Sequence, residues 1–116
     1  MSSPKPPVTC HVLDTVKGRP AKGITCRLHQ LSAAGTQATL LVTGTTNDDG
    51  RVTTWDGPLK LQDGGVYKMV FETGPYFAGD TFFPIVEITF NVKTTAEHYH
   101  IPLLLAPWSY STYRGS

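Results

Sequence analysis

Glycine and proline divide this chain into short runs of strand-forming residues. The 11 glycines and 9 prolines are spread over the whole sequence instead of gathering in a linker. The runs between them are rich in β-branched and aromatic residues, and in 85–92 the apolar side chains of Val86, Ile88, Phe90 and Val92 alternate with polar ones. We expect strands at 8–13, 23–31, 38–45, 51–54, 66–72, 85–92, 99–105 and 110–113, and a helical turn only at 73–78. This pattern predicts an all-β fold, a two-sheet β-sandwich of about eight strands with one short helix.

The length of the chain suits one domain and is too short for two. We expect a disordered arm over 1–7 and a single domain over 8–116. Ten Lys and Arg against nine Asp and Glu give a net charge of +1, without a basic run, which argues against binding of nucleic acid or of a membrane surface. The N-terminus lacks the apolar core of a secretory signal, so we expect an intracellular protein.

The two cysteines, Cys10 and Cys26, are too few for a disulfide scaffold. Free cysteine packs as a small apolar residue, so two buried thiols are the favoured interpretation. A Cys10–Cys26 disulfide remains the alternative.

The strand expected at 99–105 is apolar on both faces. Tyr99, Ile101, Leu103 and Leu105 share one face, and His100, Pro102 and Leu104 share the other. A strand that faces water on one side should not have this composition. Since a sandwich of this size has no third layer, we infer that another subunit covers the second face. The proline also predicts an edge strand or a position without a ladder hydrogen bond.

The strand expected at 8–13 has the same two-faced character. Cys10 and Val12 share one side, and Thr9, His11 and Leu13 share the other. Each of the two strands therefore places a histidine on the face that we assign to a subunit contact.

Histidines are the main candidates for chemistry, because the sequence contains no nucleophile elbow, phosphate-binding loop or Cys-x-x-Cys motif. The pKa of a histidine side chain is easily moved across neutrality, which suits His11 for acid–base catalysis. His98 and His100 form a His-x-His pair that could bind zinc with His11, although nothing completes the ligand set. The alternative for His11 is a hydrogen-bonded surface or core residue, and the alternative for the pair is one exposed and one packed histidine.

Arg51 follows the turn at 47–50 directly, and its planar guanidinium suits an amide or urea-type substrate. The alternative is a solvated loop arginine. At the other end, the residues Tyr110 to Ser116 continue a strand pattern, so we expect this segment to be docked. Ser116 would then bring a hydroxyl and a terminal carboxylate to a structured place.

Five segments together resemble the transthyretin-like family, and more specifically its 5-hydroxyisourate hydrolase branch. The segments are Thr9-Cys10-His11-Val12-Leu13-Asp14, Gly18-Arg19-Pro20-Ala21, Asp49-Gly50-Arg51, His98 to Leu105, and Tyr110 to Ser116. The ending Tyr113-Arg114-Gly115-Ser116 is specific to the enzyme branch. The segment 106–109 departs mildly from the family pattern.

The resemblance implies a homotetramer, a dimer of dimers, whose channel between subunits holds the sites. The implied reaction is hydrolysis of 5-hydroxyisourate to 2-oxo-4-hydroxy-4-carboxy-5-ureidoimidazoline in urate breakdown, with no metal and no organic cofactor. Family members occur in the cytoplasm and in the peroxisome, and the cytoplasm is the favoured compartment here.

The resemblance also assigns roles to residues. His11, Arg51, His100 and Ser116 are the expected catalytic residues. His11 and Arg51 are expected to bind substrate together with Tyr113, Arg114 and Gly115, and His98, Leu13, Pro102 and Leu104 are expected to support the site. Three alternatives stay open: a transthyretin-type carrier of small ligands, a zinc hydrolase, and an immunoglobulin-like interaction module.

Overall fold

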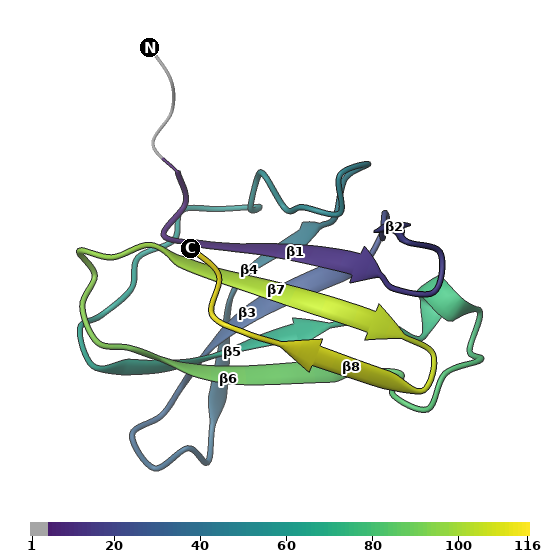
Figure 1. Cartoon of the computed structure of the whole chain (residues 1–116). Helices are drawn as coiled ribbons and strands as arrows, with labels where there is room; N and C mark the ends of the chain where they lie inside the picture. Colours follow the sequence, from purple (N-terminus) through teal and green to yellow (C-terminus); the bar gives the residue numbers. More distant parts are fainter. Residues whose placement is uncertain (1–4) are drawn as a thin grey trace.

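Two four-stranded sheets pack face to face in the computed structural model, which describes residues 5–116 (Figure 1). The first sheet has the order β2-β1-β7-β8, and the second has the order β4-β3-β5-β6. The strands of the first sheet are β1 (Val8–Asp14), β2 (Arg19–Pro20), β7 (Tyr99–Ala106) and β8 (Ser109–Thr112). Those of the second are β3 (Thr25–Leu31), β4 (Ala38–Thr45), β5 (Gly65–Phe71) and β6 (Val86–Val92). The predicted all-β sandwich is confirmed.

The core lies between the sheets and follows the two-residue alternation of the strands. Val8, Cys10 and Val12 of β1 are fully buried, whereas the residues between them are half-buried. Cys10 meets Cys26 of the opposite sheet with the two sulfur atoms 3.8 Å apart, and both are free thiols. The expected pair of buried thiols is therefore confirmed.

Three segments differ from the prediction. The residues at 19–20, expected as a turn, form the short strand β2, because β1 offers its free edge to them. No strand forms at 51–54, where only Arg51 pairs with a neighbour, through a single bridge to His11. The expected helical turn is a 3₁₀ turn, η1 (Pro75–Phe77), which ends at Ala78 with a left-handed backbone, φ 53°.

Pro102 lies in β7, which is not an edge strand, since β1 flanks it on one side and β8 on the other. Of the two positions that the proline predicted, the structure has the one without a ladder hydrogen bond and not the edge strand. Pro102 falls between the last pair of β7 with β8, Leu103 with Thr112, and the bridge from His100 to Gly115. The Pro102 carbonyl accepts from the Thr112 hydroxyl at 2.6 Å, and no residue of β8 pairs with Pro102, so the missing backbone N–H breaks no ladder bond on this side.

Of the arm expected over 1–7, residues 1–4 lie outside the described residues. The Pro7 carbonyl accepts a hydrogen bond from the Tyr99 backbone N–H at 3.0 Å. Disorder of this arm stays a prediction. Within residues 5–116, no helix is long and apolar enough to cross a membrane.

Candidate active site

Two adjacent strands of the first sheet carry the histidine side chains. β1 and β7 run parallel, and their register places Thr9 opposite His100 and His11 opposite Pro102. Residues that alternate with the core positions point to the outer face of this sheet, where Thr9, His11 and His100 are half-buried. The His11 and His100 rings lie with their centroids 6.4 Å apart. The outer face of β1 and β7 thus brings two imidazoles side by side.

The turn at 47–50 carries Arg51 to this face. The Asn47 side-chain oxygen accepts hydrogen bonds from the backbone N–H groups of Asp49 and Arg51, at 2.9 and 3.1 Å. Gly50 has φ +73°, and a Cβ atom there would overlap the carbonyl oxygen of Val12. The Gly50 carbonyl accepts from the Val12 N–H at 2.8 Å. Only glycine fits at position 50, and its close approach to the backbone of β1 places Arg51 next to His11.

The C-terminal segment lies over β7 and returns from the end of β8 toward the beginning of β1 (Figure 1). The Gly115 N–H donates to the His100 carbonyl at 3.0 Å. A Cβ atom on Gly115 would lie 2.5 Å from Cδ2 of His100, so the segment touches the imidazole itself. The expected docking of this segment is confirmed by these contacts.

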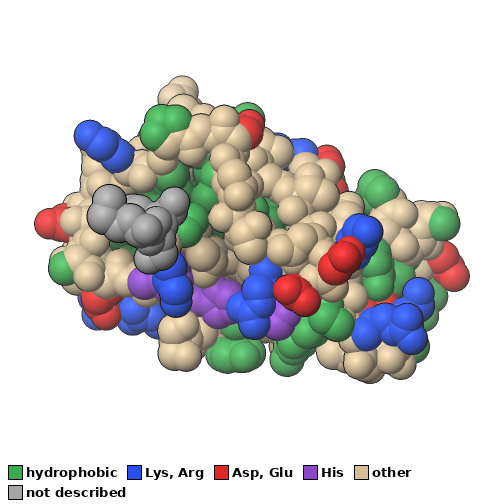
Figure 2. All heavy atoms as spheres, turned by 90° about the horizontal axis from the view of Figure 1, so that it is seen from above, with side chains coloured by type: hydrophobic (Ala, Val, Ile, Leu, Met, Phe, Trp, Pro, Cys, Tyr) green, Lys and Arg blue, Asp and Glu red, His purple; other side chains and the backbone are tan. Residues whose placement is uncertain are grey.

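A pocket of about 370 Å³ opens between these elements. Four residues expected at the site line it: Arg51, His98, His100 and Ser116. Lys5 also lines the pocket, from the N-terminal segment, and sequence reasoning missed it. Figure 2 shows histidine side chains in a row with Lys and Arg side chains on this face. His11 lies beside the pocket, next to His100.

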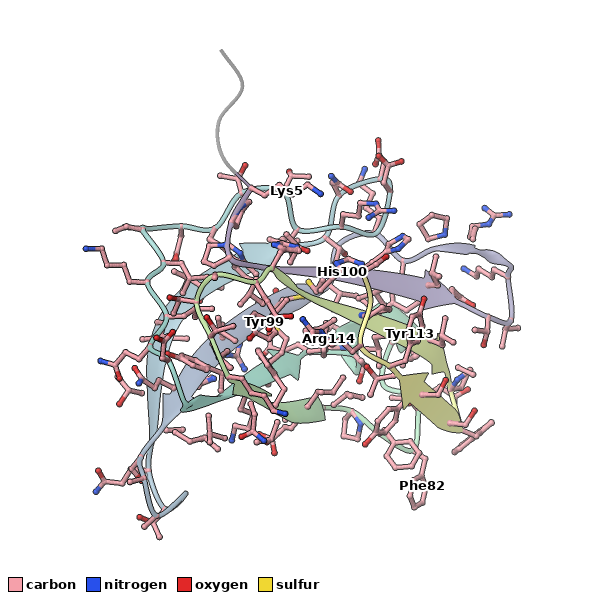
Figure 3. All side chains as sticks on the ribbon, turned by 60° about the vertical axis from the view of Figure 1, so that its left-hand side comes forward. Lys5, Phe82, Tyr99, His100, Tyr113 and Arg114 are labelled. Atoms are coloured by element: carbon pink, nitrogen blue, oxygen red, sulfur yellow. The ribbon has the colours of Figure 1, made fainter. Side chains whose placement is uncertain are left out.

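Tyr113 and Arg114 line a second pocket of about 310 Å³. The Arg114 guanidinium binds the Glu97 carboxylate at 3.1 Å and lies 5.0 Å from the centre of the Tyr99 ring. Figure 3 shows Arg114 close to Tyr99, on the opposite side of His100 from Lys5. His100 borders both pockets, whereas Arg114 does not line the pocket of Arg51, His98 and Ser116.

The expected apolar walls lie on the same outer face as the histidines. Leu13 and Leu104 are half-buried and pair in the register of β1 with β7, and Pro102 is buried opposite His11. Pro102 also lies close to Gly115, where a Cβ atom would approach its ring at 3.1 Å. These three residues border the imidazoles.

Thr9 is a site residue that sequence reasoning missed. Its hydroxyl oxygen lies 2.9 Å from Nε2 of His98 and 2.7 Å from Nδ1 of His100. The alternation of the first strand placed Thr9 on the outer face, but its partner depends on the parallel register of β1 with β7. The hydroxyl connects the two histidines of the His-x-His pair.

Burial and positive charge keep the two imidazoles neutral. Desolvation lowers the pKa of His100, and the Arg51 guanidinium, His11, His98 and Lys5 lower that pKa further. Desolvation and Arg51 also lower the pKa of His11, although Asp49 opposes this, because its backbone accepts a hydrogen bond from the ring and its side chain is negatively charged. Since the ordinary pKa of histidine is about 6.5, both rings are mainly unprotonated at pH 7 and can accept a proton.

Within residues 5–116, no group of three or more His, Cys, Asp or Glu side chains is arranged to hold a metal ion. The His-x-His pair instead faces a threonine hydroxyl.

Comparison with known proteins identifies the family. The sequence model of the HIUase/Transthyretin family matches residues 8–115. The 5-hydroxyisourate hydrolase of Mus musculus is 42% identical over 119 residues, which cover 100% of both chains. The structure of Klebsiella pneumoniae 5-hydroxyisourate hydrolase has a TM-score of 0.76 and 34% identity, over 94% of this chain and 98% of that one. Sea bream transthyretin in complex with thyroxine has a TM-score of 0.80 and 30% identity, over 94% of each chain. The fold, the matched span and these relatives together show that the chain belongs to the HIUase/Transthyretin family.

Proposed function

We propose that this chain hydrolyses 5-hydroxyisourate to 2-oxo-4-hydroxy-4-carboxy-5-ureidoimidazoline, with the outer face of β1 and β7 as its active site. The observation that carries the proposal is the pair of neutral imidazoles, His11 and His100, beside the Arg51 guanidinium and Ser116. Relatives named 5-hydroxyisourate hydrolase are 40–45% identical to the chain.

The reaction requires a base, because water must lose a proton as it attacks the ring amide. A neutral imidazole supplies this base at neutral pH. One of His11 and His100 accepts the proton of water, and the protonated ring or its neighbour then donates to the leaving nitrogen. Their ring centroids, 6.4 Å apart, place both imidazoles beside one reacting group.

Arg51 supplies the positive charge for the transition state. Attack on the amide places negative charge on the carbonyl oxygen, and a guanidinium offers paired N–H donors to it. The turn around Gly50 holds the Arg51 backbone against β1, so the side chain starts from a fixed position next to His11. Ser116, which lines the same pocket, orients water or a histidine through its hydroxyl.

The other residues expected at the site are not enclosed by the single chain, and a second subunit would complete their surroundings. Leu13 and Leu104 are half-buried in the single chain, and Tyr113 is 58% exposed. We propose a homotetramer in which a second subunit covers this face, so that Leu13, Pro102 and Leu104 exclude bulk water. Tyr113, Arg114 and Gly115 then contact substrate from the C-terminal segments. Exclusion of water strengthens every charge interaction in the site. A cytoplasmic location, with the peroxisome as alternative, stays a prediction from the sequence.

The alternative of a non-catalytic carrier is not favoured. Sea bream transthyretin shares the fold at 30% identity, below the 40–45% shared with the named hydrolases. A carrier also has no need for two unprotonated imidazoles beside a guanidinium.

The direct test follows the ultraviolet absorbance of freshly generated 5-hydroxyisourate with and without the protein. We expect the protein to accelerate the decay of 5-hydroxyisourate stereoselectively. The acceleration should be the same after exhaustive treatment with chelator. An unchanged decay rate, together with tight binding of thyroxine, would identify a carrier instead. Sedimentation analysis of the same sample checks the tetramer.

A further inference from the structure

The Thr9 hydroxyl joins two histidines that would otherwise be independent. Its oxygen lies 2.7 Å from Nδ1 of His100 and 2.9 Å from Nε2 of His98, and all three side chains are half-buried. The contact follows from the fold, since Thr9 pairs with His100 in the register of β1 with β7. His98 lies two residues before His100, so in an extended chain the two side chains point to the same face.

Counting protons limits how these three groups can bond. A hydroxyl has one proton, so Thr9 can donate to only one of the two rings, and any ring to which it does not donate must donate an N–H to it. In one arrangement Thr9 donates to Nδ1 of His100, whose neutral ring then carries its proton on Nε2. In the other, Nδ1–H of His100 donates to Thr9, and Thr9 donates to Nε2 of His98. Nε2 of His100 is free to accept a proton only where Nδ1–H of that ring donates to Thr9, and within this trio only Nε2 of His98 can then accept the Thr9 proton.

We infer that Thr9 is a positioning residue which, with His98 as the acceptor of its proton, holds His100 in the tautomer that has a free Nε2. This inference rests on the proposed hydrolysis, because it assigns His100 the part of the base. The bond from Nδ1 also fixes the ring plane. Gly115 confines the opposite side of the ring, where a Cβ atom would lie 2.5 Å from Cδ2. His100 is thus held from two sides, with Nε2 as its free nitrogen.

The group that accepts the hydrogen bond from Nδ1 of His100 is a neutral hydroxyl and not a carboxylate, and this keeps the ring a base. The groups that lower the pKa of His100 are Arg51 beside β1, His11 on β1, His98 before β7 and Lys5 of the N-terminal segment, and Glu97, Lys93 and Arg114 line a pocket with this residue on its other side. Figure 3 shows Lys5 on the side of His100 away from Arg114. A carboxylate on Nδ1 would raise the pKa of the ring and keep it protonated. A threonine hydroxyl orients the ring without that charge, and so leaves it a base at neutral pH.

The tautomer can be measured without substrate. In protein labelled with ¹⁵N-histidine, long-range ¹H–¹⁵N spectra at pH 8 distinguish a protonated ring nitrogen from a free one. We expect His100 of the unaltered protein to have a protonated Nδ1 and a free Nε2. A proton on Nε2 would overturn the inference, even if the protein hydrolyses 5-hydroxyisourate. The expected spectrum in a protein without hydrolase activity would overturn the proposed function alone.

Variants of Thr9 provide the kinetic test. Thr9→Val keeps the shape of the side chain and removes the hydroxyl, so we expect kcat to fall about 10–100-fold, as for other residues that orient a catalytic ring. KM should stay within about twofold, because the Thr9 hydroxyl is engaged by the two imidazoles. Thr9→Ser keeps the hydroxyl and should retain kcat within about threefold. Equal losses in the valine and serine variants would show that packing, and not the hydrogen bond, is what matters.

His98 should act only through Thr9, which a double-mutant cycle detects. His98→Leu removes the acceptor of the Thr9 proton, so we expect a smaller fall in kcat, of about tenfold or less. Combining His98→Leu with Thr9→Val should cause no loss beyond that of Thr9→Val alone. Independent, multiplying losses would contradict the coupling. If the valine variant fails to fold, the tautomer of the unaltered protein still decides the inference.

Discussion

Histidine lies on the outer face of both sheets, but the charged groups around it differ between the two faces. On the second sheet, His29 of β3 lies among Arg27, Lys68 and Glu87. There the cations are paired, since Arg27 binds Glu72 at 2.9 Å and Lys68 binds Glu87 at 3.1 Å. On the first sheet, His100 faces Arg51, His11, His98 and Lys5, and every one of these groups lowers its pKa.

The arrangement of charge, and not the lowered pKa of a histidine, distinguishes the outer face of the first sheet from that of the second. Desolvation is the largest cause of the lowered pKa of both His29 and His100, so a lowered pKa alone does not distinguish them. Paired charges on the second sheet leave little net field, whereas the first sheet gathers positive charge and two imidazoles around a pocket. A substrate that develops negative charge is stabilised only on the first sheet.

Removal of the imidazole should have the largest effect and should separate the two faces. We expect His100→Ala or His11→Ala to lower kcat/KM by about 10²–10⁴-fold, the usual contribution of general acid–base catalysis. His29→Ala is the matched control and should retain activity within about twofold, because it lies on the other sheet. Steady-state hydrolysis of 5-hydroxyisourate measures both. Near-normal turnover in His100→Ala would remove this histidine from the mechanism.

Removal of the guanidinium should come next. Arg51→Gln takes away the donors to the carbonyl oxygen, and we expect a fall of about 10²–10³-fold in kcat/KM. Arg27→Gln removes a guanidinium of the same kind from the paired face, with an expected cost of about 1 kcal/mol or less in stability and none in activity. The assay of hydrolysis and thermal unfolding together check the pair. Similar activities of the two variants would contradict the role of Arg51.

A methyl group beside the reactive imidazole should have a smaller effect. Gly115→Ala places a Cβ atom against the His100 ring, so we expect the ring to shift and kcat to fall about tenfold to a hundredfold. Gly57→Ala is the control, because a Cβ atom there has no neighbour within 4 Å. The melting temperatures of both variants should stay close to that of the unaltered protein. A fully active Gly115→Ala would show that the ring tolerates displacement.

The pH dependence of stability should show the smallest effect. The folded pKa of His29, His11 and His100 is lowered, so below about pH 6.5 the unfolded chain binds protons that the folded chain does not. The free energy of unfolding should therefore fall as pH decreases from 7 to 5. His29→Gln removes one of these groups and should weaken the dependence while leaving the acid limb of kcat/KM unchanged. Urea unfolding at several pH values measures the first quantity, and an altered acid limb would contradict the separation of the two faces.

Local alternation explains why most of the fold could be predicted. In β6 the two-residue period of apolar side chains indicated the strand and its buried face from neighbouring residues alone. The errors fall where pairing partners decide the structure: β2 forms because β1 offers an edge, and Arg51 makes one bridge instead of starting a strand. The proline left two positions open, an edge strand or a position without a ladder bond, and the pairing of β7 with β1, which is distant in sequence, decided between them.

The same distinction holds for the candidate site. His11, His98, His100, Arg51 and Ser116 are residue types whose chemistry can be read in the sequence, and the structure brings Arg51, His98, His100 and Ser116 around one pocket with His11 beside it. Arg114 is also a plausible anion-binding residue, yet in the single chain it binds Glu97. Thr9 has no distinguishing sequence feature, and its importance appears only from its distances to two rings.

By itself the sequence determined the strands, the faces they bury and the set of side chains available for chemistry, because these depend on residue type and on spacing over a few residues. The tertiary structure alone decided which side chains meet. Thr9 and His100 are 91 positions apart and become partners only through the parallel register of β1 and β7. That register is set by packing of the whole core between the sheets, which no short segment encodes.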